Sequence, residues 1–163
     1  MSTIAIRPAE PGDADAIWAI LEPVIRAGET YPLPREFDRA AAFAYWLGPA
    51  NAVFVAQEDG RILGTYYLRA NTGGGGAHVA NCGYMTAAHA AGRGIGRAMC
   101  LHSLAAAKAR GFRAMQYNLV IGTNARAVHL WQACGFAVVG RLPGAFLHPV
   151  HGYVDALVMY RAL

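Results

Sequence analysis

The chain has 163 residues, of which 55% are hydrophobic, and 14 Lys and Arg residues against 10 Asp and Glu residues give it a formal charge of +4. This length predicts one domain over residues 1–163, with enough apolar material for a single core. The basic residues are scattered and no apolar run approaches the length of a membrane span. We therefore expect a cytoplasmic protein that binds neither nucleic acid nor a membrane.

Cysteines and histidines are too dispersed to define a disulfide framework or a metal site. Cys82, Cys100 and Cys134 form no Cys-x-x-Cys pair, and the 6 histidines lack the ligand spacing of zinc proteins. We expect reduced, buried thiols and no metal.

The first third of the chain predicts one strand and two helices. Alternating apolar residues indicate a strand at residues 3–7, and Asp13 is placed to cap a helix that ends at Gly28. The prolines that follow predict an irregular loop at residues 29–34. A second helix is expected over residues 38–47.

The rest of the chain predicts strands and helices in turn. Asp59-Gly60 joins two β-rich runs and indicates a hairpin, and the four glycines at residues 73–76 indicate a mobile loop tip. The last two strands should be separated by a loop that contains Pro143 and Gly144. The expected elements are strands at 53–56, 62–68, 78–85 and 114–120, helices at 94–110 and 124–135, and final strands at 138–140 and 154–160.

The junction between the strand at 78–85 and the helix that follows is rich in glycine. Gly92, Gly94 and Gly96 carry no Cβ atoms, and the first N–H groups of a helix have no internal partner. Such a turn favours an anion, above all a pyrophosphate, with Arg93 and Arg97 adding charge from the side. Arg97 stands where a dinucleotide fingerprint needs glycine, and a Walker ending is missing. A turn without ligand is the alternative reading.

This turn resembles the pyrophosphate loop of the Gcn5-related N-acetyltransferases (GNAT), Gln/Arg-x-x-Gly-x-Gly/Ala. Gly94 and Gly96 fit that pattern, whereas Ala91 stands at its first position. Residues 124–136 resemble the family's second signature, Asn-x-x-Ala-x-x-Leu-Tyr-x-x-x-Gly-Phe, with Trp131 in place of the tyrosine. The resemblance implies a mixed α/β fold whose central sheet is mostly antiparallel, splays between its two central strands and is flanked by helices.

The resemblance also implies an enzyme that moves the acetyl group of acetyl-CoA, as co-substrate, directly to an amine. Backbone groups near Met85 and Thr86 would bind the pantetheine arm. The residues expected at the pyrophosphate are Gly92, Arg93, Gly94, Ile95, Gly96 and Arg97. Asn124 is the candidate catalytic residue, because its amide could bond the cofactor or orient the reacting groups; a helix cap alone is the alternative. Trp131 is a poor acid, so the family's usual proton donor is absent here.

The acceptor amine should lie among polar residues near the splay. The amide N–H groups of Asn81 and Asn118 would hold a carboxylate, with Tyr84 as a wall or hydroxyl donor. Glu29 and Tyr31 lie in the loop that overlies the acceptor in this family, and Glu29 could recognise or deprotonate the amine. The structural alternatives are amides bonded to backbone across the splay, a core aromatic and an exposed loop acid. Weaker base candidates are His78, His89, His129 and Asp155.

A narrower resemblance is to the acetyltransferases that act on proline analogues such as azetidine-2-carboxylate. It rests on residues 28–32, 79–85, 117–124, 139–144 and 154–157. The expected acceptor is a small amino acid or toxic analogue. The alternatives are a phosphinothricin-type or other xenobiotic amine acetyltransferase, a protein N-terminal or ribosomal-protein acetyltransferase and a non-catalytic acyl-CoA-binding module. The apolar composition and terminal strands are compatible with a homodimer.

Overall fold

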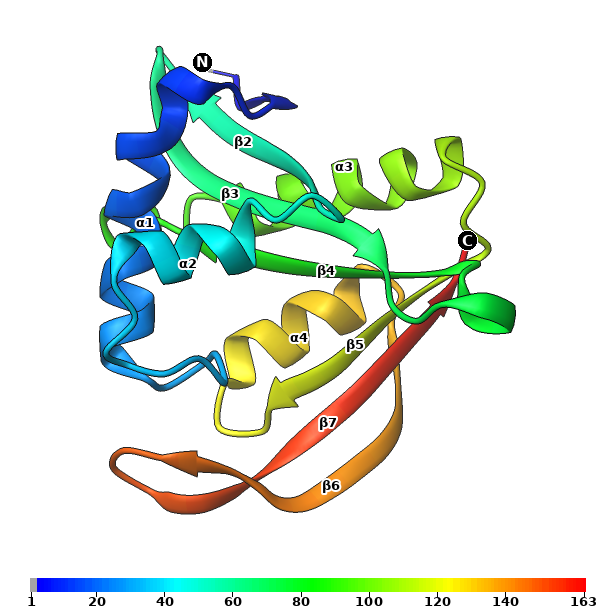
Figure 1. Ribbon diagram of the computed structural model, residues 1–163. Helices are drawn as coiled ribbons and strands as arrows, with labels where there is room; N and C mark the ends of the chain where they lie inside the picture. The colour runs from blue at the N-terminus through cyan, green and yellow to red at the C-terminus, as the bar shows by residue number, and fades with distance from the viewer. Residues whose placement is uncertain (1–2) are drawn as a thin grey trace.

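A seven-stranded sheet forms the centre of the computed structural model, which describes residues 3–163. The strands lie side by side in the order β1-β2-β3-β4-β5-β7-β6 (Figure 1). Their bounds are β1 Ala5–Pro8, β2 Ala52–Glu58, β3 Arg61–Ala70, β4 Val79–Thr86, β5 Ala114–Ile121, β6 Ala137–His148 and β7 Gly152–Ala162. The helices are α1 Ala14–Ala27, α2 Arg39–Trp46, α3 Ile95–Ala109 and α4 Ala125–Ala133.

The sheet opens between β4 and β5. These two strands are parallel and pair only at Val79 with Ala114 and Ala80 with Met115. Beyond these pairs the strands diverge, and α4 lies beside the gap (Figure 1). All other neighbouring strands are antiparallel. The predicted fold, a mostly antiparallel sheet with a central splay, is confirmed, and the main-chain groups along the splay need partners from outside the sheet.

Helices cover both faces of the sheet. On one face Trp46 of α2 is fully buried and its indole N–H donates to Thr65 Oγ1 on β3. On the other face the side chains of Ile95 and Met99 on α3 pack against Gly64 of β3. Because both faces are covered, β3 is buried from residue 63 to residue 68. Among residues 3–163, no helix combines the length and apolar character that a membrane span requires.

The C-terminal hairpin is longer than predicted. The strand expected at 138–140 continues to His148 as β6, so the prediction of a loop around Pro143 and Gly144 was wrong. β6 lies at the edge of the sheet and its pairing with β7 shifts register between Leu142 and Phe146. An edge strand with a bulge tolerates proline, because the missing N–H would face solvent.

Asp13 is the N-cap residue of α1, as predicted, but its side chain makes no cap hydrogen bond. Its carboxylate accepts two 2.8 Å hydrogen bonds from the Arg7 guanidinium and a 2.7 Å bond from the Glu10 N–H. These bonds lower the pKa of Asp13 and tie β1 to the start of α1. In the glycine run, Gly74–Gly76 forms a single 3-10 turn, and its mobility stays a prediction.

Candidate active site

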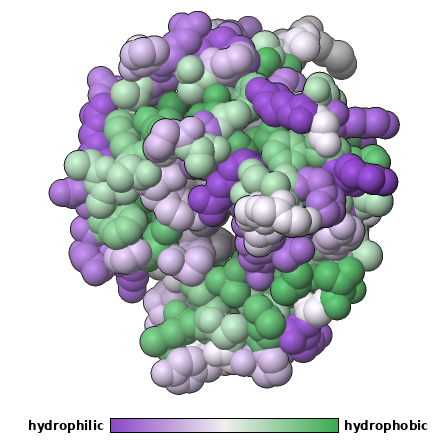
Figure 2. Space-filling view, turned by 45° about the vertical axis from the view of Figure 1, so that its right-hand side comes forward, coloured by the Kyte–Doolittle hydropathy of each residue, from purple (hydrophilic) through white to green (hydrophobic). Residues whose placement is uncertain are grey.

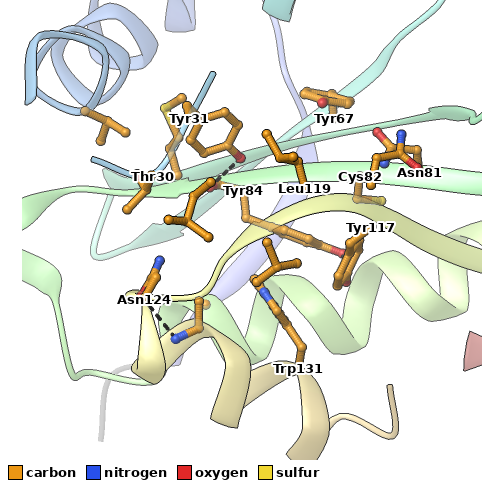
Figure 3. A pocket seen from close by; sticks show the side chains of 18 of the residues that line it. Thr30, Tyr31, Tyr67, Asn81, Cys82, Tyr84, Tyr117, Leu119, Asn124 and Trp131 are labelled. Carbon is orange, nitrogen blue, oxygen red and sulfur yellow. Dashed lines mark hydrogen bonds between the residues drawn. The ribbon is translucent and has the colours of Figure 1, made fainter. Parts of the chain in front are cut away.

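A cavity of about 420 Å³ opens where β4 and β5 diverge. Its walls come mainly from β3, β4, β5, α4 and the loop between α1 and α2, with one residue each from α1, α2 and α3 (Figure 3). The volume lies within the range of small-molecule sites in proteins. Sequence elements that are far apart in the chain therefore meet at the splay.

The edge of β4 supplies main-chain groups to this cavity. Hydrogen bonds from Asn71 N to Val79 O (2.8 Å) and from Ala87 N to Leu63 O (2.9 Å) fix the ends of the β3–β4 ladder. In this register the N–H and C=O groups of Met85 face β3, whereas those of Tyr84 and Thr86 face the splay. The side chain of Met85 still lines the cavity. Of the two residues predicted at the pantetheine arm, Thr86 offers backbone groups and Met85 offers its side chain.

The loop between α1 and α2 covers the cavity, as the resemblance implied. Tyr31 donates its hydroxyl to the main-chain oxygen of Tyr84 at 2.9 Å (Figure 3). Its ring packs edge-on against Trp46, with centroids 6.0 Å apart. Burial raises the pKa of Tyr31 well above its ordinary value. Thr30 also lines the cavity, whereas Glu29 is exposed and is not among the lining residues that the structure describes.

The two predicted asparagines line the cavity, and each donates one of its two amide N–H groups to the protein. Asn81 is buried and donates from Nδ2 to the Gln116 carbonyl at 2.9 Å. Asn118 is exposed rather than buried, and its Nδ2 donates to Asn71 Oδ1 at 2.7 Å. Asn81 thus bonds backbone across the splay, as in the structural alternative, whereas Asn118 bonds the side chain of Asn71.

An aromatic cluster forms the floor of the cavity. Trp131 lies with its ring centroid 4.9 Å from Tyr84 and 5.2 Å from Tyr117 (Figure 3). The Tyr84 hydroxyl shares hydrogen bonds with Ser103 Oγ (2.7 Å) and the Tyr117 hydroxyl (2.8 Å). Burial raises the pKa of both tyrosines well above the ordinary value. Tyr84 is therefore both a wall of the cavity and a bonded core residue, and it stays protonated.

Cys82 is the cysteine that lines the cavity. Burial raises the pKa of its thiol to about 12, so it is not a thiolate at neutral pH. All three cysteines are free and buried, as predicted. A covalent intermediate on Cys82 is therefore disfavoured.

The glycine turn has the geometry of an anion site. Gly92 (φ 79°) and Gly94 (φ 82°) adopt left-handed backbone conformations that side chains disfavour. The first bond of the α3 ladder runs from Ala98 N to Gly94 O (3.0 Å), so the N–H groups of the three preceding residues lie outside the ladder. Of these three, Gly96 lines the cavity, while the Ile95 side chain is buried in the core. These donors fit the pyrophosphate that the resemblance implies.

The arginines near this turn differ in their surroundings. Arg93 pairs with Glu58 and lies against a separate hollow of about 340 Å³, away from the main cavity. Arg97 is exposed on the first turn of α3. Arg126 was not predicted; its Nη2 lies 3.7 Å from the point where a Cβ of Gly92 would stand. Its position near the glycine turn could have been inferred from the sequence, because Arg126 lies in the first turn of α4, two residues after the N-cap Asn124.

Asn124 is the N-cap of α4 and also lines the cavity. Its Oδ1 accepts the Ala127 N–H at 3.3 Å, which leaves the Nδ2 hydrogens for another partner (Figure 3). The cap and the proposed catalytic contact therefore use different atoms.

Three lining residues were missed at the end of the cavity under α2. Tyr45 and Tyr67 bring their hydroxyl oxygens within 3.2 Å of each other, and Arg69 follows Tyr67 on the same face of β3. The Tyr67 ring packs against Gly83, where a side chain would clash, because a Cβ at that position would lie 2.5 Å from Tyr67 Cε1. The strand pattern was visible in the sequence, but the register that brings these residues to the splay was not.

Acidic and imidazole side chains are absent from the described lining of the cavity. His78, His89, His129 and Asp155 all lie elsewhere. Asp155 accepts from Arg141 (2.9 Å) and from the Gly144 N–H (3.0 Å), and these bonds lower its pKa. Within residues 3–163, no group of metal-ligating side chains is arranged to hold an ion.

Comparisons with known proteins give the family. The model of the acetyltransferase (GNAT) family matches residues 16–136. The structure of a GCN5-related N-acetyltransferase from Kribbella flavida is 44% identical, with 98% of both chains covered and a TM-score of 0.94. N-acetyltransferase aca1 of Schizosaccharomyces pombe is 28% identical over an alignment of 151 residues that covers 82% of this chain and 72% of that protein. A phosphinothricin acetyltransferase from Sinorhizobium meliloti, in complex with AcCoA, shares the fold at 23% identity, with 99% and 89% covered and a TM-score of 0.85. The chain belongs to the acetyltransferase (GNAT) family and is an acetyl-CoA-dependent N-acetyltransferase.

Proposed function

We propose that the protein transfers the acetyl group of acetyl-CoA directly to the amine of a small amino acid or toxic analogue, of the proline-analogue type. The observation that carries the proposal is the cavity end formed by Tyr31, Tyr45, Tyr67 and Asn81, which is aromatic and covered by the α1–α2 loop. Such a site suits a compact acceptor with a few polar groups.

The cofactor half of the site uses backbone groups. The free N–H groups at the start of α3 hold the pyrophosphate, and the main-chain groups of Tyr84 and Thr86 accompany the pantetheine arm. Bound there, acetyl-CoA supplies an activated thioester whose carbonyl lies in the splay. The N–H groups of β4 that face the splay are the chain's candidates for stabilising negative charge on that carbonyl oxygen.

The acceptor amine must lose a proton, and the described lining offers no carboxylate or imidazole to take it. The amine of a free α-amino acid is more basic than the α-amino group of a peptide, whose pKa is near 8, so only a small fraction of the acceptor is neutral at pH 7 and its proton must leave before the attack. We assign the proton to water at the cavity mouth. The role of the chain is to orient the neutral amine against the thioester.

Asn124 is the catalytic residue of the proposal. Its Oδ1 is held by the Ala127 N–H, which fixes the amide and directs Nδ2 away from the cap. A fixed amide N–H that lines the cavity can donate to the thiolate as it leaves. The Asn124 amide therefore supplies part of the stabilisation of the leaving thiolate that the family's usual tyrosine, replaced here by Trp131, would provide as a proton donor.

One solved structure bears on the acceptor. The Sinorhizobium meliloti structure is a phosphinothricin acetyltransferase, which supports an alternative acceptor, phosphinothricin, that is also an amino acid. Both acceptors carry an amine beside a carboxylate, so one assay covers them.

The proposal is tested by incubating the pure protein with acetyl-CoA and each of azetidine-2-carboxylate, proline, phosphinothricin and a panel of further amino acids. Free thiol is followed with time. We expect release above hydrolysis with azetidine-2-carboxylate. Release with phosphinothricin alone would favour the alternative acceptor, and release with none of the amino acids would overturn the proposal.

A further inference from the structure

Arg69 places a positive charge in the acceptor end of the cavity. It is half-buried near the end of β3 and lines the cavity beside two tyrosines. Its guanidinium carbon lies 5.2 Å from the ring centroid of Tyr67 and 5.9 Å from that of Tyr45. Stacking on aromatic rings holds a guanidinium in place without using its N–H donors.

The guanidinium has no counterion in residues 3–163. No carboxylate lies within 4.0 Å of it, and no hydrogen bond from its nitrogens to the protein is present in that part of the chain. The described lining of the cavity contains no acid that could approach it. By contrast, carboxylates pair with Arg7, Arg26, Arg39, Arg93 and Arg141. An unpaired arginine inside a cavity is suited to a planar anion, which it can bind with two parallel N–H bonds.

Asn81 lies directly across from Arg69 in the β3–β4 register. Side chains of such a pair point to the same face, with Cβ atoms about 5 Å apart. The Asn81 Nδ2 is committed to the Gln116 carbonyl, while no described group donates to its Oδ1. A cation and a free acceptor thus stand side by side at this end of the cavity, and Figure 3 shows Asn81 and Tyr67 there, away from Asn124.

We propose that Arg69 determines acceptor specificity by binding a carboxylate next to the reacting amine, while Asn81 Oδ1 accepts a hydrogen bond from that amine. The inference rests on the proposed function and names the class of its substrate: compact α-amino acids and their ring analogues. It differs from the expectation that the amide hydrogens of Asn81 and Asn118 hold the carboxylate, since one N–H of each amide already donates to the protein. An amine without a carboxylate leaves Arg69 desolvated and unpaired, which is unfavourable.

The kinetic test compares azetidine-2-carboxylate with azetidine, which has the same ring and no carboxylate. Arg69→Gln removes the charge, Arg69→Lys keeps it, and Arg113→Gln removes an exposed arginine outside the cavity as a charge-matched control. We expect Arg69→Gln to lower kcat/KM for azetidine-2-carboxylate by about 10- to 100-fold, mainly through KM. The kcat/KM for azetidine should change less than about twofold in Arg69→Gln. Arg69→Lys should retain part of the kcat/KM for azetidine-2-carboxylate that Arg69→Gln loses. Equal losses with both acceptors would overturn the inference.

A binding test separates this inference from the proposed function. Tetrahydrofuran-2-carboxylate has the proline ring and carboxylate but no nitrogen, so it cannot be acetylated. Calorimetry on the CoA-loaded protein should show binding to the wild type and to Arg113→Gln, and at least about tenfold weaker binding to Arg69→Gln. This result would support the carboxylate site even if no amino acid were turned over. No binding, or equal binding to all three proteins, would overturn it.

Discussion

The hydroxyl of Tyr31 donates a 2.9 Å hydrogen bond to the main-chain oxygen of Tyr84, and this bond joins the α1–α2 loop to the β4 edge at the splay. Tyr84 in turn contacts Trp131 from α4 through its ring. One short chain of contacts therefore connects the cover of the cavity, the strand that lines it and the helix on its far side. The acceptor and cofactor halves of the site share this connection.

Removing the Tyr31 hydroxyl tests whether the loop orders the acceptor site. Tyr31→Phe keeps the packing on Trp46 but loses the bond to Tyr84, so the free energy of unfolding should fall by about 1 kcal/mol. The acceptor KM should rise about fivefold as the loop loosens, with little change in acetyl-CoA affinity. Tyr153→Phe is the control, since Tyr153 is 78% exposed on the C-terminal hairpin. An unchanged acceptor KM in Tyr31→Phe would show that the bond only stabilises the fold.

Asn124 can be tested by separating its cap from its amide donor. Asn124→Asp keeps an oxygen for the Ala127 N–H and should leave the free energy of unfolding within about 0.5 kcal/mol of the wild type, whereas Asn124→Ala should lose about 1 kcal/mol. Both variants lack the Nδ2 donor, so kcat should fall by about 100-fold in each. Melting curves and steady-state kinetics measure the two effects. Full activity in Asn124→Asp would reduce the residue to a cap.

The pH dependence follows from the tyrosines at the site. Burial raises the pKa of Tyr31, Tyr84 and Tyr117 well above the ordinary value, so their hydroxyls stay protonated from neutral to mildly alkaline pH. Raising the pH then increases only the neutral fraction of the acceptor amine. We expect kcat/KM to rise with pH without a falling limb up to about pH 9.5. A rising limb that stays at the same pH when the amine pKa is changed would reveal a base on the protein and contradict this account.

The C-terminal hairpin carries exposed apolar side chains, which gather at the lower end of the molecule in Figure 2. Leu147 is 62% exposed and Val150 is 74% exposed. We propose that this surface meets a second copy of the chain, so the mass measured by light scattering should be twice that of the monomer. Val150→Asp should yield the monomer, whereas Leu101→Asp on α3 serves as the control. A monomer mass for the wild type at micromolar concentration would rule this out.

The sequence allowed the fold and the two helix starts beside the splay to be predicted, because their signals are local. The glycines before Ile95 and the asparagine before α4 each specify a helix start, and the structure brings both helix starts to the splay. The acceptor half depends on register between distant strands. Arg69 meets Asn81 only through the β3–β4 ladder, and nothing near Arg69 in the sequence indicates it.

Two local differences from the expected structure have the same origin. Pro143 was interpreted as a loop residue, since the sequence does not reveal that β6 forms the edge of the sheet. Asp13 does occupy the N-cap position of α1, but its carboxylate is bound by Arg7, a partner on another element, and makes no cap hydrogen bond to the helix. In both cases a tertiary neighbour decided the outcome, and local residue preference did not.

A crystal structure with CoA and tetrahydrofuran-2-carboxylate bound together tests the central claim most directly. We predict the pyrophosphate on the N–H groups of residues 95–97, the pantetheine arm along the β4 edge at Tyr84 and Thr86, and the carboxylate on Arg69. CoA bound away from the splay, or the ring acid bound outside the cavity under Tyr31, would contradict the account.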